Sequence, residues 1–303
     1  MNFLITGATG FIGKKLVDTL LSAGHRVNYL GRMRSKDLDS RAAFHCWRAD
    51  EKPPLNSVPR LDAVIHLAGE PIAQRWTEAV KRRIYESRIA GTRNLVSTIG
   101  ELRYKPAVLV CASAVGYYGN RGDEILTEES SPGSGFLADL CVQWEQEARK
   151  AQEFGLRVVP IRIATVLGRD GGALAKMVTP FKLGLGGKFG SGRQWMSWIH
   201  ADDLVRLLIF AAENPTIHET LNGASPGPVT NAEFTKTLSG VLRRPAFCTV
   251  PKFAVKLALG EMADVVFDSQ RVLPKATERS GFRFDYGDLR NALEQLLTSQ
   301  IAP

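Results

Sequence analysis

The sequence predicts an α/β fold, a doubly wound parallel sheet with a smaller C-terminal α+β lobe. Short apolar strands alternate with helical patterns over residues 1–167, and such alternation indicates right-handed βαβ units. The first strand leads directly into a glycine-rich turn and a helix. The chain has 303 residues and is 44% hydrophobic, which is enough apolar material for a large core.

The predicted strands of the sheet are residues 2–6, 26–30, 63–67, 107–111 and 157–163, with 44–48 as an extra edge strand. Helices are predicted over residues 12–23 and 77–99. The stretch GFLADLCVQWEQEA, residues 135–148, has apolar residues three and four positions apart, which predicts a further amphipathic helix.

The sequence pattern changes after about Leu167. Residues 184–194, GLGGKFGSGRQ, are rich in glycine and could close over a substrate. WIHADDLVRLLIFAAE predicts a strand end and a helix capped by Asp202 or Asp203. We therefore predict a sheet domain at 1–167, to which 197–224 return, and a lobe formed mainly by 168–303.

Lys and Arg number 39 against 31 Asp and Glu, a net charge of +8. The basic residues are spread along the chain and accompany no nucleic-acid motif, which argues against nucleic acid as a partner. No apolar run approaches the roughly 18 residues of a membrane span, and the apolar N-terminus is a poor signal peptide. We expect a cytoplasmic monomer or homodimer without a membrane partner.

The four cysteines are Cys46, Cys111, Cys141 and Cys248. None are spaced as a CxxC metal or redox pair, so we predict buried free thiols in a reducing cytosol and no metal site.

The turn TGATGFIG, residues 6–13, has the features of a phosphate-binding turn. Gly7 permits a tight turn, Gly10 lets the backbone approach a diphosphate, and Gly13 lets the helix pack closely on the strand. The helix N-terminus adds free N–H groups and a positive dipole end. The alternative is a tight βα turn without a ligand.

The second strand ends in NYLGRMRSK, where an NAD site would have an acidic residue for the ribose. Gly31 takes that place, and Arg32, Arg34 and Lys36 follow. Guanidinium groups bind a 2′-phosphate well, so the sequence favours NADP over NAD. The alternative is three exposed cations in a loop.

Arg88 interrupts an apolar helix stripe that includes Val80, Ile84, Gly91 and Leu95. An arginine on a core-facing stripe needs a partner. That partner is either a cofactor phosphate or an internal carboxylate.

TGATGFIG, AVIHLAGEPI, CASAVGYYG and WIHADDL together resemble the extended short-chain dehydrogenase/reductase superfamily. The segments RWTEAVKRRIYESR, PFKLGLGGKFGSGRQWMSWIHADDL, NGASPGPVTNAEF and LPKATERSGFRF make the match narrower. They resemble an atypical branch, the epimerase family proteins with a C-terminal domain of unknown function. The resemblance covers nearly the whole chain and implies a Rossmann domain that binds NADP, with a smaller substrate lobe.

The resemblance and the residue patterns together predict a set of cofactor-binding positions. These are Gly7, Thr9, Gly10, Phe11, Ile12, Gly13, Gly31, Arg32, Arg34, Leu67, Ala68, Gly69, Arg88 and Ser113.

The superfamily's catalytic set is Ser or Thr followed by Tyr-x-x-x-Lys. Ser113 fits the serine, but the Tyr and Lys positions fall at about Leu137 and Cys141. This departure argues against ordinary carbonyl reduction, because leucine cannot transfer a proton. Tyr117, Tyr118 and His200 are the candidate replacements, and structural packing is the alternative role for all three.

The sequence therefore favours an NADP-dependent oxidoreductase, or a nucleotide-sugar-epimerase-like enzyme, with an unknown small-molecule substrate. The alternative is a non-catalytic NADP(H)-binding protein that senses redox state or docks a partner.

Overall fold

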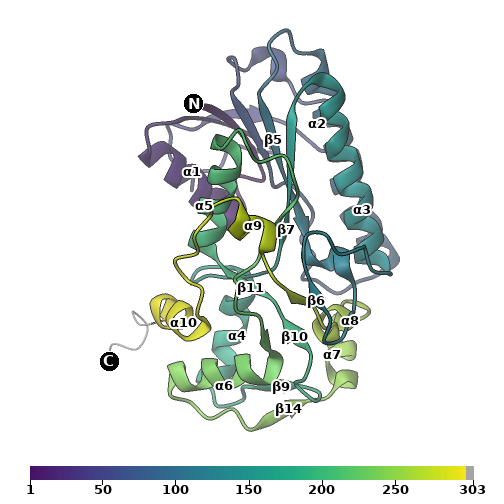
Figure 1. Ribbon diagram of the computed structural model, residues 1–303, viewed down its shortest axis with the longest axis vertical. Helices are drawn as coiled ribbons and strands as arrows, with labels where there is room; N and C mark the ends of the chain where they lie inside the picture. Colours follow the sequence, from purple (N-terminus) through teal and green to yellow (C-terminus); the bar gives the residue numbers. More distant parts are fainter. Residues whose placement is uncertain (298–303) are drawn as a thin grey trace.

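The computed structural model describes residues 1–297, and within them a seven-stranded parallel sheet forms the centre of the fold (Figure 1). The strand order is β12-β7-β5-β4-β1-β2-β3. The strands are β1 (Asn2–Thr6), β2 (Arg26–Gly31), β3 (Ala43–Cys46), β4 (Ala63–His66), β5 (Val108–Ala114), β7 (Arg157–Ile163) and β12 (Leu221–Gly223). The predicted doubly wound α/β fold is confirmed.

The order of strands reverses at β1. This strand pairs with β2 on one side and with β4 on the other, so Thr6 lies opposite both Leu30 and His66. The connections that leave β1 and β4 run to opposite faces of the sheet. A crevice at the carboxyl ends of such strands is where α/β proteins bind their ligands.

Helices cover both faces of the sheet. The helices are α1 (Phe11–Ser22) and α5 (Ala201–Glu213) on one face, and α2 (Glu78–Glu101) and α3 (Phe136–Arg149) on the other (Figure 1). Alternation along β1 serves both layers, because Phe3 and Ile5 pack with α1 and α5, whereas Leu4 packs with α2 and α3.

The predicted cap of α5 is wrong. The N-cap is His200, whose Nδ1 accepts a hydrogen bond from the backbone N–H of Asp202 at 3.1 Å. Asp203 is fully buried, and its carboxylate accepts the backbone N–H groups of Asp285 and Tyr286 at 3.0 and 2.9 Å. These tertiary contacts of Asp203 with Asp285 and Tyr286 outweigh the local preference for an aspartate at the N-cap.

The C-terminal lobe lies below the sheet in Figure 1. Its helices are α4 (Gly172–Lys182), α6 (Asn231–Leu242), α7 (Lys252–Leu259), α8 (Met262–Phe267) and α10 (Leu289–Leu297). Helix α9 (Lys275–Arg279) instead lies beside α5 and packs on β12 of the sheet (Figure 1). The strand pairs of the lobe are β8 (Thr165–Leu167) with β11 (Trp198–His200), β9 (Gly187–Phe189) with β14 (Cys248–Val250), β10 (Trp195–Met196) with β13 (Val229–Thr230), and β6 (Ile125–Leu126) with β15 (Arg271–Val272). Trp198, Phe234 and Leu293 are buried in its core.

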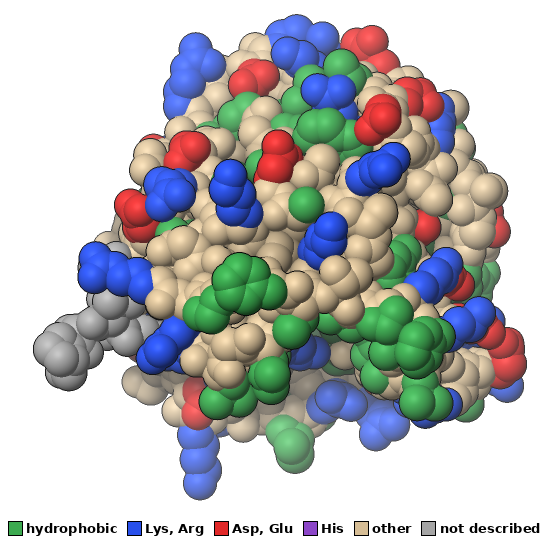
Figure 2. Space-filling view, turned by 90° about the horizontal axis from the view of Figure 1, so that it is seen from below, with side chains coloured by type: hydrophobic (Ala, Val, Ile, Leu, Met, Phe, Trp, Pro, Cys, Tyr) green, Lys and Arg blue, Asp and Glu red, His purple; other side chains and the backbone are tan. Residues whose placement is uncertain are grey.

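The underside of the lobe carries exposed hydrophobic side chains between basic ones, as Figure 2 shows. Phe247, Phe253 and Leu257 are among the exposed large hydrophobic residues of this lobe. None of the helices in residues 1–297 combines the length and the apolar character that a membrane crossing requires.

Cysteine exposure differs in part from expectation. Cys111 and Cys141 are buried free thiols, whereas Cys46 and Cys248 are exposed. Cys46 ends the edge strand β3, which has a neighbour on one side only, so its side chain stays accessible.

Candidate functional site

The turn after β1 leaves no room for a side chain at Gly7 or Gly13. Gly7 has φ +74°, a left-handed conformation that favours glycine, and a Cβ there would lie 2.7 Å from the carbonyl carbon of Leu67. A Cβ on Gly13 would lie 2.1 Å from the carbonyl oxygen of Gly7. Gly10 closes the turn by donating its N–H to that same oxygen at 3.0 Å. The turn therefore brings bare backbone to the crevice.

The first amides of α1 face this turn. Gly10 is the N-cap, and no side chain caps the helix. The first N–H groups of a helix lack intrahelical acceptors and carry partial positive charge. The amides of Phe11 and Ile12 are thus suited to an anion, beside the exposed Thr9.

The side chain of Phe11 has a separate task. A Cβ on Gly168 would lie 2.1 Å from its ring, and a Cβ on Gly171 would lie 2.4 Å from it. The ring therefore packs against the loop between β8 and α4 and joins this loop to the turn.

The end of β2 is rich in cations, as predicted from the sequence. Arg32 and Arg34 are exposed beyond Gly31, and neither forms an ion pair within residues 1–297. The carboxylates of Asp37 and Asp39 are held by other cations at 2.6 and 2.7 Å. Both guanidinium groups are therefore available to a phosphate.

A buried polar chain joins the ends of β1 and β4. Thr6 Oγ1 accepts the N–H of Ala68 at 3.1 Å and lies 2.6 Å from His66 Nδ1, while His66 Nε2 lies 2.9 Å from Thr92 Oγ1. Burial, with a smaller effect of Arg88, lowers the pKa of His66 to about 4, so the ring is neutral near pH 7. These bonds fix the backbone from Leu67 onward along the crevice.

Arg88 of α2 lies against the chain that leaves β4. A Cβ on Gly69 would lie 2.9 Å from Arg88 Cζ. The guanidinium donates to the carbonyl oxygens of Glu70 at 3.0 Å and Ile84 at 3.3 Å, and it lies 5.0 Å from the ring centroid of Trp144.

Burial lowers the pKa of Arg88 to about 10. Across the described part of the chain, no carboxylate lies within 4.0 Å of its guanidinium, so the internal ion pair considered from the sequence is not formed. A half-buried guanidinium without a carboxylate keeps its positive field for another anion.

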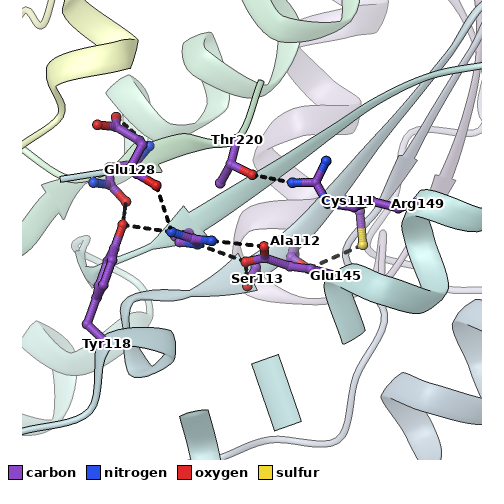
Figure 3. Close-up of polar contacts among 10 residues, drawn as sticks. Cys111, Ala112, Ser113, Tyr118, Glu128, Glu145, Arg149 and Thr220 are labelled. Atoms are coloured by element: carbon purple, nitrogen blue, oxygen red, sulfur yellow. Dashed lines mark hydrogen bonds and ion pairs between the residues drawn. The ribbon is translucent and has the colours of Figure 1, made fainter. Parts of the chain in front are cut away.

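Ser113 ends β5 and is buried. Its hydroxyl donates to Glu145 Oε1 at 2.8 Å, and Figure 3 shows the two side chains pointing toward one another. Glu145 comes from α3 and also accepts from Arg162 Nε at 2.9 Å and Arg162 Nη2 at 3.1 Å. Ser113 and Arg162 are register partners on β5 and β7, which brings all three together.

Sequence reasoning missed Glu145 and Arg162. The signal was available, because each is a charged residue inside an apolar pattern, one on the α3 stripe and one in the strand RVVPIRI. Such residues indicate a buried pair.

The two tyrosines occupy different environments. Tyr118 is fully buried, donates to Asn222 Oδ1 at 2.7 Å and accepts from Arg162 Nη1 at 3.1 Å (Figure 3). Burial raises its pKa to about 12. Tyr117 is half-buried, and its ring centroid lies 3.3 Å from Arg162 Cζ. Both rings therefore support the Arg162 guanidinium.

His200 is not brought together with Ser113. Besides capping α5, its Nε2 lies 3.0 Å from Gln295 Oε1, and its ring stacks on Tyr286 at 3.8 Å. Both ring nitrogens are thus engaged in the packing of α5 and α10.

A cleft of about 220 Å³ opens beside Leu137, the residue at which the sequence predicts the position of the superfamily tyrosine. Leu137 packs on Gly116, and Val265, Asp268 and Gln270 of the C-terminal lobe form part of the facing wall. Cys141, at the position of the lysine, is buried, and burial raises the pKa of its thiol to about 11. Neither position offers the superfamily's proton-transfer chemistry.

Nothing in residues 1–297 indicates a metal centre, because no group of three or more potential His, Cys, Asp or Glu ligands converges there.

Residues 3–222 match the family described as NAD dependent epimerase/dehydratase, and residues 250–296 match a domain of unknown function. The chain is 42% identical to the chloroplastic epimerase family protein SDR39U1 homolog of Arabidopsis thaliana, over 98% of this chain and 87% of the relative. It is 39% identical to the epimerase family protein YfhF of Bacillus subtilis, over 99% of both chains.

Two solved structures show the same architecture. The human epimerase family protein SDR39U1 (isoform 2), crystallised with NADPH, matches with a TM-score of 0.89 at 33% identity, over 98% of this chain and 99% of that one. The nucleoside-diphosphate sugar epimerase of Corynebacterium glutamicum matches with a TM-score of 0.80 at 34% identity, over 98% of this chain and 58% of that one.

The resemblance seen in the sequence is thus confirmed, and the chain belongs to the NAD dependent epimerase/dehydratase family, among the epimerase family proteins with a C-terminal domain of unknown function.

Proposed function

We propose that this protein binds NADP(H) at the carboxyl ends of β1 and β4 and acts as an oxidoreductase or an epimerase-like enzyme. Gly7, Gly10 and the first amides of α1 would hold the diphosphate, and Arg32 with Arg34 would hold the 2′-phosphate. The glycine cradle fits this group, because a Cβ on Gly7 would meet the backbone at 2.7 Å. The human relative crystallised with NADPH supports the same cofactor.

Arg88 is the observation that carries the proposal. Its guanidinium is half-buried beside Gly69, just beyond the end of β4, and no carboxylate within residues 1–297 lies within 4.0 Å of it. A fold retains such an uncompensated charge at a cost in stability. A bound phosphate would supply the missing anion and explain the position.

NADPH, when bound, supplies a hydride to an acceptor carbon. The side chains near the cleft determine which substrate groups can be bound beside that acceptor carbon. The Ser113 hydroxyl already donates to Glu145, so its oxygen presents lone pairs and suits a substrate hydroxyl better than a carbonyl. The relative whose structure is that of a nucleoside-diphosphate sugar epimerase supports an epimerase-like substrate with hydroxyl groups.

A non-catalytic NADP(H)-binding protein is the second candidate. It is favoured by Leu137 and Cys141, which cannot exchange protons near neutral pH, and by Tyr118, whose pKa is raised to about 12. Such a protein would report redox state or dock a partner. We also propose a cytosolic location for either function, in keeping with the free thiols.

Calorimetric titration with NADPH, NADP and NADH tests the cofactor, after the purified protein has been checked for cofactor carried through purification. We expect tight binding of NADP(H) and weak binding of NADH. Absence of binding by all three would overturn the proposal and leave the fold serving another use.

Turnover separates the two candidates. NADPH oxidation by members of a broad carbonyl panel, lost in Ser113→Ala and Tyr117→Phe with cofactor affinity retained, would support the enzyme. NADPH binding without oxidation of any panel member would favour the non-catalytic protein.

A further inference from the structure

The segment 268–270 between α8 and β15 is pinned to the sheet domain by Ser269. Its backbone N–H donates to Asn120 Oδ1 at 3.1 Å, and its hydroxyl donates to the carbonyl of Gly122 at 2.7 Å. The hydroxyl also accepts the N–H of Trp195 at 3.0 Å. Ser269 is buried, so the orientation of this extended segment is fixed.

Side chains alternate along an extended segment, so Asp268 and Gln270 face away from Ser269. Both line the cleft beside Leu137. Val272, two residues further, is fully buried in one cluster with Val115, next to the end of β5. The side chains of Asp268 and Gln270 therefore point into this cleft, whereas Val272 anchors the segment in the core.

Neither polar side chain is used by the fold. In the part of the chain that the structure describes, the carboxylate of Asp268 and the side-chain amide of Gln270 form no hydrogen bond or ion pair. A half-buried carboxyl group that faces a cleft without a partner is suited to contact a ligand.

We infer that Asp268 is the proton donor and acceptor of the reaction and that Gln270 holds the substrate oxygen beside it. The inference rests on the proposed oxidoreductase or epimerase-like function and assigns a task to the C-terminal domain of unknown function. Leu137, at the place that the resemblance gives to the superfamily's tyrosine, has no proton to transfer, and Asp268 reaches the same cleft from the facing lobe.

The step balances in atoms and electrons. In the reducing direction the carbonyl carbon gains the hydride that NADPH supplies when bound, and the carbonyl oxygen gains the proton of the Asp268 carboxyl group. The products are an alcohol, NADP and the Asp268 carboxylate, which regains a proton from solvent. In the oxidising direction the carboxylate accepts the hydroxyl proton of the alcohol.

The surroundings of Asp268 favour its protonated form. Burial and the negative charge of Asp264 raise its pKa, while Lys252 opposes them. The other two carboxylates that line the cleft are paired with lysines: Asp264 with Lys252 at 2.8 Å and Glu261 with Lys81 at 2.9 Å. An acid with a raised pKa is closer to the working range of a proton donor.

A crystal structure of the NADPH complex is the first test, and it needs no substrate. We expect the Asp268 carboxyl group and the nicotinamide ring to face one open cavity, with no protein atom between them. An Asp268 side chain that points away from the nicotinamide, or is screened from it by protein, would overturn the inference.

The second test compares Asp268→Asn with Asp264→Asn on the full-length holo-protein, with NADPH oxidation over a panel of aldehydes and ketones. We expect Asp268→Asn to lose roughly 10²–10⁴-fold in rate with NADPH affinity unchanged. Asp264→Asn should keep its rate at low pH, but the loss of rate with rising pH should begin at lower pH, because the charge that raises the pKa of Asp268 is gone.

The outcomes separate this inference from the function on which it rests. Wild-type rate in Asp268→Asn overturns the role of Asp268 and leaves the enzyme intact. NADPH binding without oxidation of any panel member by the wild type overturns the enzyme itself, and the role of Asp268 with it.

Discussion

The guanidinium of Arg88 lies so close to Gly69 that a Cβ on Gly69 would stand 2.9 Å from Arg88 Cζ. The Arg88 guanidinium fits here only because residue 69 has no side chain. The pair lies just beyond the carboxyl end of β4, at the crevice. Within residues 1–297, no carboxylate lies within 4.0 Å of the Arg88 guanidinium. This position at the crevice is why we propose that Arg88 binds a cofactor phosphate, in addition to its bonds to the backbone carbonyls of Glu70 and Ile84.

Arg88→Met should therefore weaken NADPH binding while leaving the fold intact. A hydrogen bond to a charged group contributes about 1.5–3 kcal/mol, so we expect a loss of roughly 10- to 100-fold in affinity by fluorescence titration. Thermal stability without cofactor should stay about equal, because removal of a half-buried charge that lacks a carboxylate offsets the loss of the bonds to the carbonyls of Glu70 and Ile84. Unchanged affinity together with a lower Tm would show that Arg88 is purely structural.

Arg32→Ala should reduce the preference for NADP over NAD. The guanidinium is exposed and unpaired within the described residues, so its loss removes charge-assisted bonds to a 2′-phosphate and nothing from the fold. We expect at least about a tenfold loss for NADPH and little change for NADH by calorimetry. Arg41→Ala is the matched control, since that nearby exposed arginine is bound to Asp39 at 2.7 Å. Equal losses in both variants would contradict the assignment.

Glu145→Ala should destabilise the protein by about 3–5 kcal/mol, because it leaves the buried Arg162 guanidinium without its carboxylate. The double variant Glu145→Leu with Arg162→Met should recover most of that loss, since apolar residues then replace both charges. Urea unfolding monitored by fluorescence measures both. A double variant no more stable than the single one would show that the rest of the network, including Ser113 and Tyr118, depends on the ion pair.

The buried His66 predicts a dependence of stability on pH. The pKa of His66 is lowered from 6.5 to about 4. Between pH 4 and pH 6.5 the unfolded chain therefore binds a proton at His66, whereas the folded chain does not. Stability is therefore complete above pH 6.5 and falls as pH decreases toward 4, by about 3 kcal/mol at most. His66→Gln should lack this part of the slope in urea unfolding at pH 4 to 7.

The pKa values of His45 and His200 are also lowered, so the difference between wild type and variant isolates His66. A variant whose slope equals that of the wild type would contradict the prediction.

Local features of the site were readable from the sequence. Gly10 and Gly13 act through backbone contacts with residues close in the chain, and Arg88 was visible because a helix repeats its faces every three to four residues. The sheet followed from the alternation of strands and helices. These signals need no knowledge of which distant segments meet.

Features that depend on distant segments were not readable. The partner of Ser113 is Glu145, and that choice follows from how α3 packs on β5 and β7. His200 became a helix cap because its ring is also held by Gln295, far along the chain. Asp268 carried no periodic signal, since its place at the cleft comes from the anchoring of its neighbour Ser269.

The last strand of the sheet, β12, pairs with β7 only after the chain has passed through residues 164–220. A nascent chain that has reached residue 167 holds six strands, and β7 then offers a long unpaired border to any other extended peptide. Helix α5, which buries apolar residues of this sheet, is also still missing at that point. Synthesis therefore passes through an interval in which an aggregation-prone edge is open. In a fragment that ends at residue 167, this edge of β7 would remain unpaired permanently.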